Sequence, residues 1–571
     1  MLIGIDVGGT TTDAVLIRNG EVYSTAKVLT EPDNLLSSLL EAFDAVSEGV
    51  SSEQLERVVF STTVITNLIA EGKTDRVALV LIPGPGVNPA IYTFPDSFYL
   101  KGAIDYRGRE IQALDETEVR ETIEEIWKLK YPRAAIVSKF GQRNPSYELM
   151  IEEKFREIYP ECKLGLGHKV SGKLNFPRRV ATALLASATR ERYQEFVARI
   201  KNALEERGIN APVYILKADG GTLEVEKSIA FPVETIFSGP AASTIGALAL
   251  TPEGETSVVV DIGGTTTDLA LILSGKPLLA SKGAKLGGFL THIRAFAVRS
   301  IPVGGDSVVR VIETDPDCKK SITIGPERVG PACCMGGKET TPTDALRVLG
   351  FVEVGDLERA KQGIRNIAAG LGENEIETAS LIVDKTTRLI TRAVNEMFLE
   401  WEQEPAYRIW EVLQEKKARP QNVVGIGGGA RGLIAGVAEK LNARPVIPEH
   451  AEVGNAIGAA LARPTLTLNL HIDTEQKTYS VAEEGEFVGL NSNDIGNFNK
   501  IGLDKVEMFA SKLLKARAEK FGISEYADEA ETVNAEVFNI INGWYTVGRI
   551  FDVEMQIPAG LISQWKRGKE E

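Results

Sequence analysis

Cysteine and histidine are both scarce in this chain. Only four residues of each type occur among 571. The cysteines are too few and too irregularly spaced to form a disulfide framework. No two histidines have the His-x-x-x-His spacing that is typical of zinc sites. The sequence therefore argues against a disulfide-stapled protein and against a zinc enzyme.

Long apolar runs are also missing, and basic charge is in deficit. No stretch approaches the roughly 20 apolar residues that a membrane helix needs. Asp6 interrupts the apolar N-terminal stretch, so that stretch does not have the pattern of a signal peptide. The 64 basic and 79 acidic residues give a net charge of −15, which argues against nucleic acid or an anionic membrane as a partner. We therefore expect a cytoplasmic protein that binds any phosphate locally.

The remaining composition is that of a globular protein with more than one domain. Apolar residues make up 43% of the chain and charged residues 25%, and there are 54 glycines. A chain of this length is too long for a single core, so two or three domains are expected.

An internal repeat indicates how those domains are related. Residues 5–13 read IDVGGTTTD, and residues 260–268 read VDIGGTTTD. Apolar residues precede and follow each copy, which predicts a strand, a tight glycine turn and a second strand. Two such copies, each heading a domain-length stretch, make an ordinary pair of hairpins improbable.

The residue types in the repeat suit phosphate binding. A Gly-Gly turn brings backbone N–H groups close to an anion without an intervening Cβ atom, and the threonines add hydroxyl donors. An aspartate at the end of the first strand is placed to hold Mg²⁺, usually through its water shell. We therefore assign Mg²⁺ positioning to Asp6 and Asp261. The predicted phosphate-binding residues are Gly8, Gly9, Thr10, Thr11, Thr12 and Asp13, with Gly263, Gly264, Thr265, Thr266 and Asp268 as their counterparts.

Later motifs extend this α/β pattern. Strand-like runs such as Val77–Ile82 alternate with helix-like runs such as Arg178–Glu206, as in α/β folds. A buried strand at residues 423–426 is followed by Gly427, Gly428 and Gly429, which we expect to face an adenosine group. Residues 238–246 and 452–460 predict two helices rich in small residues, which would permit close packing at an interdomain hinge.

The order of these motifs resembles the nucleotide signature of the actin, sugar kinase and heat-shock chaperone superfamily. More narrowly, the chain is similar to the hydantoinase A/oxoprolinase family over about residues 1–465. That resemblance depends on the order of several short motifs in this sequence, namely STTVITN at 61–67, DYRGRE at 105–110, DGG at 219–221, SGPA at 238–241, GPAC at 330–333 and PTDA at 342–345.

The resemblance implies a fold and a domain division. The fold is α/β, with duplicated ribonuclease-H-like, actin-like domains on either side of a nucleotide cleft, and a small C-terminal α+β region. We expect residues 1–250 to form the first half, with family-specific insertions, and residues 251–464 to form the second half. Residues 465–571 would be an accessory or oligomerisation unit.

The resemblance also implies a function. ATP, with Mg²⁺, would phosphorylate the carbonyl oxygen of a cyclic amide such as hydantoin or 5-oxoproline and so activate it for ring opening. A second, hydantoinase-B-like subunit, bound to a homodimer of this chain, would complete the reaction. Asp344 is a candidate for direct chemistry, with capping of the helix that begins at Ala345 as the alternative. Two other functions stay open: an ATP-driven chaperone or reactivating factor, and a subunit of an ATP-dependent ketone carboxylase.

Overall fold

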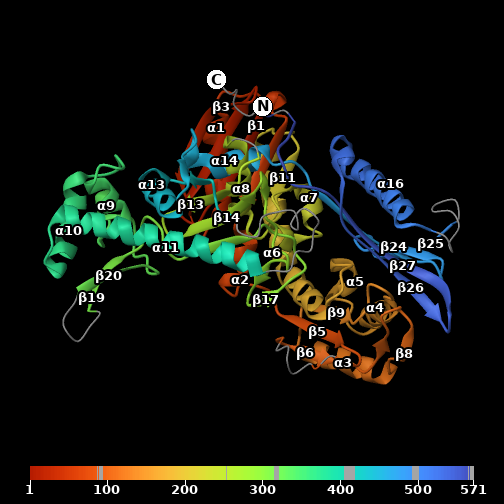
Figure 1. Cartoon of the computed structure of the whole chain (residues 1–571). Coiled ribbons are helices and arrows are strands. Elements are labelled where there is room, and N and C mark those ends of the chain that lie inside the picture. The colour runs from red at the N-terminus through yellow and green to blue at the C-terminus, as the bar shows by residue number, and fades with distance from the viewer. Residues whose placement is uncertain are drawn as a thin grey trace.

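Two β-sheets of matching design form the centre of the molecule, and smaller units are attached to them (Figure 1). The structure is a computed structural model. It describes the whole chain except residues 32, 87, 89–93, 252–253, 314–319, 404–417, 492–500, 564 and 566–571.

The first central sheet has the strand order β12-β11-β4-β1-β2-β3. Strands β1, β2 and β3 are antiparallel neighbours, whereas β4 and β11 run parallel to β1. The strands are β1 (Leu2–Val7), β2 (Thr11–Arg18), β3 (Glu21–Leu29), β4 (Arg57–Thr62), β11 (Val213–Leu216) and β12 (Thr222–Glu224).

The second central sheet repeats this arrangement. Strand β13 pairs antiparallel with β14 and parallel with β21, as β1 pairs with β2 and β4. The register also repeats, because Asp6 lies opposite Asp13 and Asp261 lies opposite Asp268. The predicted duplication is therefore confirmed. The strands are β13 (Ser257–Ile262), β14 (Thr267–Leu273), β15 (Lys276–Pro277), β18 (Val298–Ile301), β21 (Asn422–Ile426) and β22 (Arg444–Val446).

Long helices bury one face of each sheet. On the first sheet, Phe43, Phe60 and Tyr193 belong to one continuous core. On the second sheet, Ile390 and Phe398 belong to the corresponding core. Phe60 belongs to β4. The helices that pack on the sheets are α1 (Leu35–Ser47), α6 (Phe176–Glu206), α11 (Glu375–Gln403) and α13 (Ala430–Leu441), and short helices α2 (Val64–Ala70), α5 (Gly167–Val170) and α7 (Val225–Ser228) accompany the first half.

Helices α8 (Ser238–Leu250) and α14 (Gly454–Leu461) pack between the two sheets with almost no side chain separating them. A Cβ atom on Gly246 would lie 2.1 Å from the Gly454 carbonyl oxygen, and one on Gly458 would lie 1.9 Å from the Ala242 carbonyl oxygen. Strand β1 is equally close, since a Cβ atom on Gly4 would lie 2.1 Å from the Ala456 carbonyl oxygen. The small residues at these positions are thus required by the backbone separation, which confirms the expected close packing.

An inserted α/β unit projects from the first half (orange in Figure 1). Its sheet has the order β10-β9-β5-β6, and it has a hydrophobic core of its own that includes Tyr147 and Phe155. Its elements are β5 (Val77–Ile82), β6 (Ser97–Tyr99), β7 (Ala103–Ile104), β8 (Glu110–Gln112), α3 (Glu116–Lys128), β9 (Arg133–Ser138), α4 (Ser146–Ile158) and β10 (Lys163–Leu166).

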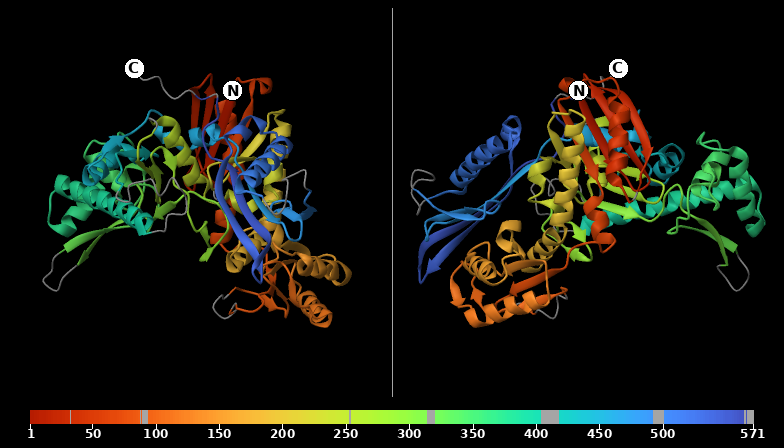
Figure 2. Two further views of the ribbon diagram at one scale, coloured as in Figure 1. Left: turned by 45° about the vertical axis from the view of Figure 1, so that its right-hand side comes forward. Right: turned by 180° about the vertical axis from the view of Figure 1, so that it is seen from behind.

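A second projection belongs to the second half and lies on the opposite side of the molecule (Figure 2). It packs around Ile322, Ile364 and Ile382. Its elements are β19 (Val309–Glu313), β20 (Lys320–Ile324), α9 (Pro342–Val348) and α10 (Leu357–Leu371), while the small hairpin β16 (Lys285–Leu286) and β17 (Phe289–Leu290) reaches back toward the first half.

The C-terminal unit is an antiparallel sheet with one helix on its face. The sheet order is β25-β24-β23-β27-β26, and α16 covers a core that includes Phe509 and Phe551. The chain then returns to the first half, where the indole of Trp565 donates to the Ala249 carbonyl oxygen at 3.2 Å. The elements are β23 (Leu466–Asp473), β24 (Thr478–Val481), β25 (Glu486–Gly489), α16 (Leu503–Phe521), β26 (Glu531–Asn542) and β27 (Tyr545–Ile557).

A search of the described helices finds none that combines the length and apolar character of a membrane span.

The close approach of α8 and α14 makes a prediction about stability. Gly458→Ala should lower the thermal unfolding midpoint, with a cost of roughly 1–3 kcal/mol, because the new methyl group meets a backbone carbonyl oxygen that cannot move freely. Gly489→Ala is the matched control, since no atom lies within 4 Å of its Cβ position. Equal midpoints for the two variants would contradict the packing described for these helices.

Candidate functional site

The two Gly-Gly turns of the repeat have the same backbone geometry. The Gly8 amide donates to the Thr11 carbonyl oxygen at 3.0 Å, and the Gly263 amide donates to the Thr266 carbonyl oxygen at 3.0 Å. No atom lies within 4 Å of the position that a Cβ atom on Gly9 would take. The first turn therefore leaves open space beside its backbone, as an approaching anion requires.

The two turns lie against the same cleft, one from each half of the molecule. A Cβ atom on Gly264 would lie 3.6 Å from the Thr10 hydroxyl oxygen, so the turns are near neighbours. The cleft has a volume of about 720 Å³. Its lining comprises Gly8, Gly9, Thr10, Thr11, Asp13, Lys27, Asp261, Ile262, Gly263, Gly264, Thr265, Thr266, Asp268, Gly427, Gly428, Glu452 and Asn455.

Asp6 and Asp261 meet beneath this cleft. Both are buried, and the Asn455 side-chain amide nitrogen bridges them, at 3.2 Å from Asp6 Oδ2 and 3.0 Å from Asp261 Oδ2. The Ser243 hydroxyl also donates to Asp261 Oδ2, at 2.5 Å. Asn455 comes from α14 and Ser243 from α8, so the two closely packed helices supply the groups that hold the carboxylates.

Sequence reasoning missed Asn455 and Ser243. Both lie in the small-residue helices that the sequence predicted, one turn or less from the glycines that pack there. A polar residue next to such a glycine was the available signal, because a helix without bulky side chains brings its remaining polar groups close to its neighbour.

The carboxylates at the cleft hold their protons more tightly than ordinary aspartates. Burial raises the pKa of Asp6 to about 7, and the nearby Asp13 and Asp261 carboxylates act in the same direction. Burial raises the pKa of Asp268 to about 6, with a smaller contribution from the Asp261 carboxylate. Burial also raises the pKa of Asp13, although Lys27 Nζ lies only 2.6 Å from its Oδ1. Asp13, Asp261, Asp268 and Glu452 line the cleft and Asp6 lies beneath it, while Lys27 is the one cationic side chain among the lining residues.

The carboxylate oxygens of Asp6 and Asp261 suit Mg²⁺ that is bound together with phosphate. Asp6 Oδ1 is buried and makes no hydrogen bond, so an acceptor is left without a partner at the bottom of the cleft. The described residues contain no group of three His, Cys, Asp or Glu side chains that could enclose a metal alone. Mg²⁺ commonly keeps several waters and takes one or two carboxylates with substrate phosphates, which matches an isolated pair of aspartates.

Thr12 and Gly429, which the sequence predicted to bind the nucleotide, do not line the cleft. Thr12 is fully buried, and its hydroxyl lies 3.0 Å from that of Thr30. Its counterpart Thr267 is buried in the same way and donates to the Val303 carbonyl oxygen. Alternation along a strand explains this, because a residue next to one that faces the cleft faces the core. Gly429 lies against the Ile262 side chain and begins α13, whereas Gly427 and Gly428 line the cleft.

Asp344 is not among the residues that line the cleft, and its position matches the capping role given as the alternative. Its side chain is fully buried and accepts hydrogen bonds from the backbone amides of Thr341, Cys333 and Cys334, at 3.0, 3.0 and 2.7 Å. It caps α9, as the alternative proposed. With its oxygens occupied by three amides, it has no access to the cleft.

The start of α9 does support the second turn indirectly. Thr343 bonds through its amide and hydroxyl to the Gly305 carbonyl oxygen. The amides of Gly305 and Asp306 in turn donate to the Gly263 and Gly264 carbonyl oxygens at 2.9 and 2.7 Å. The second turn therefore rests on a loop that sequence reasoning did not identify as part of the site.

Comparison with protein families gives two matches that together cover most of the chain. The Hydantoinase/oxoprolinase family matches residues 179–467, and the Hydantoinase/oxoprolinase N-terminal region matches residues 2–159.

Several curated proteins are similar in sequence. The acetophenone carboxylase gamma subunit of Aromatoleum aromaticum is 27% identical over 66% of this chain and 58% of its own length. The acetone carboxylase beta subunit of Xanthobacter autotrophicus is 24% identical over 62% of this chain and 54% of its own length. 5-Oxoprolinase 1 of Arabidopsis thaliana is 20% identical over 61% of this chain. The chain thus spans little more than half the length of either carboxylase subunit.

Two solved structures share the fold along almost the entire chain. A nucleotide-free acetone carboxylase superposes with a TM-score of 0.70 at 19% identity, covering 100% of this chain and 89% of that one. An ATP-dependent caprolactamase from Pseudomonas jessenii superposes with a TM-score of 0.69 at 18% identity, covering 99% and 88%. The predicted α/β fold class, with its actin-like duplicated domains, is confirmed.

The raised pKa of Asp6 predicts how stability depends on pH. The folded state keeps the Asp6 proton up to about pH 7, whereas the unfolded chain releases it near pH 4, so stability falls as the pH rises between these values. Asp6→Asn should remove this contribution, raising the thermal midpoint at about pH 8 by an amount equivalent to no more than about 4 kcal/mol, with little change near pH 4. Asp528→Asn is the control, because that side chain is exposed at the surface. Parallel pH profiles for Asp6→Asn and the parent would contradict the assignment.

Proposed function

The chain belongs to the hydantoinase/oxoprolinase family, and from that membership and the cleft geometry we propose that it is an ATP-dependent enzyme subunit that activates a cyclic amide for ring opening. The substrate would be hydantoin, 5-oxoproline or a similar lactam. The observation that carries the proposal is the pair of matching Gly-Gly turns that face one cleft from two halves of the molecule, each with a buried aspartate beneath it.

The residues of the cleft suit a phosphoryl-transfer site. Transfer of a phosphoryl group asks a protein mainly for positioning and for stabilisation of negative charge. The backbone amides and threonine hydroxyls of the two turns would hold the phosphates of ATP, and Gly427 and Gly428 would leave room for the adenosine group. Asp6 and Asp261 would hold Mg²⁺, which when bound offsets the charge of the phosphates and of the aspartate carboxylates.

The chemistry explains why ATP would be needed. A neutral amide is a poor electrophile, and water attacks its carbonyl carbon slowly. Transfer of the terminal phosphoryl group of ATP to the carbonyl oxygen forms an O-phosphorylated imidate and ADP. Attack by one water on the imidate carbon would give a tetrahedral intermediate, from which the ring nitrogen leaves as the protonated amine and the ring opens to an acyl phosphate. A second water would hydrolyse the acyl phosphate to a carboxylate and inorganic phosphate.

A ketone is the second candidate substrate, and two relatives support it. They are named as subunits of acetophenone and acetone carboxylases. The enolate oxygen of a ketone could take the phosphoryl group at the same site, and a carboxylation would follow in place of hydrolysis. The nucleotide cleft serves both reactions equally well, so only the substrate separates them.

We further propose a division of labour along the chain. Residues 1–250 and 251–464 would act as two halves that close on the nucleotide, hinged where α8 and α14 meet. Residues 465–571 would serve as an accessory unit that meets a partner. Its hairpin supports this role, because β26 is an edge strand on which the Ile541 side chain is 67% accessible, and Trp544, in the turn between β26 and β27, is 98% accessible.

The proposed reaction predicts ATP hydrolysis that depends on a small molecule. Purified protein should hydrolyse ATP faster when 5-oxoproline or hydantoin is present, measured as phosphate release in the presence of Mg²⁺. Asp6→Asn and Asp261→Asn should each reduce that rate roughly a hundredfold or more, because charge stabilisation by a bound metal ion contributes several kcal/mol. Arg392→Gln is the control, since that side chain is 80% exposed and far from the lining residues.

Other outcomes of this experiment identify the alternatives. Stimulation by acetone or acetophenone, with no response to lactams, would transfer the assignment to the ketone reaction. Stimulation by a folded protein alone would favour a chaperone or reactivating factor. Parental rates in either aspartate variant would contradict the two-turn site.

The second prediction of this section concerns a partner. We expect this chain to form a homodimer and to need a second, hydantoinase-B-like subunit to complete ring opening, as relatives named as subunits suggest. The isolated chain should therefore hydrolyse ATP without forming the ring-opened product. Trp544→Ser should weaken co-purification with the partner, and Trp127→Ser, at 53% exposure on α3, is the matched control. Complete ring opening by the isolated chain, at the rate found in cell extract, would show that the partner is unnecessary.

A further inference from the structure

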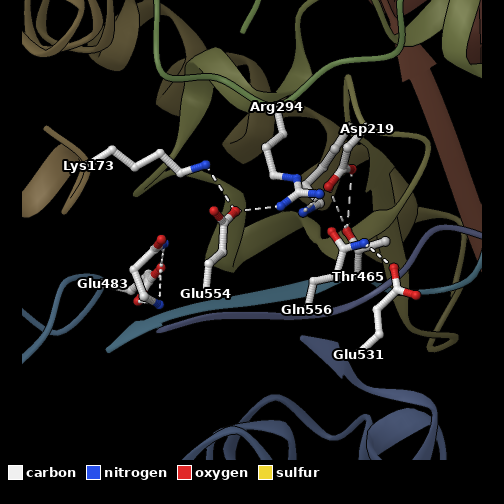
Figure 3. Close-up of polar contacts among 10 residues, drawn as sticks. Lys173, Asp219, Arg294, Thr465, Glu483, Glu531, Glu554 and Gln556 are labelled. Carbon is white, nitrogen blue, oxygen red and sulfur yellow. Dashed lines mark hydrogen bonds and ion pairs between the residues drawn. The ribbon is translucent and has the colours of Figure 1, made fainter. Parts of the chain in front are cut away.

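A second cavity lies between the first half and the C-terminal unit, and it shares no lining residue with the nucleotide cleft. Five separate stretches of the chain build it: the end of α5 with the loop after it, two residues of α6, the segment that follows β11, residues 292–294, and the C-terminal unit. Figure 3 shows polar side chains from these stretches converging above the C-terminal sheet.

The segment that carries residues 292–294 comes from the second half but is fixed to the first. The His292 amide donates to the Thr182 hydroxyl at 3.0 Å, and the Phe296 amide donates to the Ala218 carbonyl oxygen at 3.0 Å. Ile293 is buried in the core of the first half. The cavity wall is therefore held in place by buried contacts on both sides of residues 292–294.

The lining is rich in positive charge for so acidic a protein. Five lysine or arginine side chains and three aspartate or glutamate side chains line the cavity, although the whole chain has a net charge of −15. A basic cavity in an acidic protein attracts an anionic ligand and disfavours a cationic one.

Two of these side chains, Lys173 and Arg294, share one acceptor, the Glu554 carboxylate, which is not itself among the lining residues. Lys173 Nζ and Arg294 Nη1 both donate to a single oxygen, Glu554 Oε1, at 2.9 and 2.6 Å, and Figure 3 shows them reaching it from opposite sides. Arg294 Nη2 is buried and makes no hydrogen bond. A buried guanidinium nitrogen without an acceptor is costly, and a ligand carboxylate would satisfy it.

His292 stands beside this group without adding a charge. Burial and then the neighbouring Arg179 and Lys173 lower the pKa of His292 to about 3, so its ring is neutral at neutral pH. Neither ring nitrogen makes a well-formed hydrogen bond within the described structure. The imidazole therefore adds one donor that a ligand could use.

A second group in the same cavity is acidic. Lys217 lies 3.4 Å from Asp219 and 3.5 Å from Glu234, so one ammonium group faces two carboxylates. Burial acts to lower the pKa of Lys217, but the two carboxylates outweigh it and raise that pKa, which keeps the group cationic. Asp219 also accepts from the Gly221 amide and the Thr465 hydroxyl, whereas Lys217 is the one side chain paired with Glu234 among the described residues, so this group suits a ligand with an N–H donor for Glu234. Apolar side chains complete the lining, including those of Leu223, Phe231, Val233 and Phe521.

We infer that this cavity is a binding site for a small organic carboxylate that also carries an N–H donor on an apolar ring or chain. The carboxylate would pair with Arg294 and Lys173, the N–H would face Glu234, and the apolar body would lie on the aliphatic and aromatic lining. If the proposed function is correct, this site favours lactams that carry a carboxylate over neutral ones.

Two ring compounds of the same size test this inference by calorimetric titration of the full chain without ATP. 5-Oxoproline has a carboxylate on its lactam ring, and 2-pyrrolidinone has the same ring without it. We expect 5-oxoproline to bind and 2-pyrrolidinone to bind at least roughly tenfold more weakly, since a hydrogen bond to a charged group is lost. Arg294→Gln should weaken 5-oxoproline binding roughly ten- to a hundredfold and leave the neutral ring unaffected.

Further variants separate a lost contact from a lost fold. Lys173→Gln alters a side chain that is 36% exposed, and it should weaken 5-oxoproline binding in the same direction. Arg392→Gln is the matched control and should bind like the parent. Equal affinity for the two rings, no binding of 5-oxoproline, or parental binding by both cavity variants would overturn the inference. Binding without stimulation of ATP hydrolysis would instead count against the proposed function and leave this site in place.

Discussion

The backbone contact between α8 and α14 is the constraint on which the cleft depends. These helices approach so closely that a methyl group at Gly246 or Gly458 would overlap a main-chain carbonyl oxygen of the other helix. Ser243 lies three residues before Gly246, and Asn455 lies three residues before Gly458, so the same approach delivers both polar side chains to the buried carboxylates. A wider helix separation would leave Asp6 and Asp261 without the amide that bridges them.

Electrostatic strain at this point gives the cleft its chemical character. Two carboxylates share one amide donor, two more lie on the adjacent strands, and burial holds the pKa of Asp6 near neutrality. Such a cluster is unfavourable as anions and becomes favourable when a cation enters. The fold thus leaves Asp6 Oδ1 without a hydrogen-bond donor at the place where metal and phosphate would meet.

A polar contact joins two of the accessory units. Arg143 of the inserted unit forms a two-pronged ion pair with Asp552 of the C-terminal sheet, at 3.0 and 2.8 Å. Paired geometry of this kind fixes orientation as well as proximity. The second cavity lies beside the same C-terminal sheet, at its boundary with the first half, where cations and carboxylates from different units are brought together in unequal numbers.

The sequence by itself determined the features that depend on neighbouring residues. The Gly-Gly turns, their flanking apolar strands and the two small-residue helices are each encoded within about ten residues, and all of them form where the pattern predicts. Only the tertiary structure decided which side chains meet. Asn455 is 449 residues from Asp6, and Arg294 is 260 residues from Glu554. No pattern of neighbouring residues indicates that either pair will be in contact. Thr12, Gly429 and Asp344 show the same limit, because residue type and spacing fix what a side chain can do, whereas packing fixes which way it points.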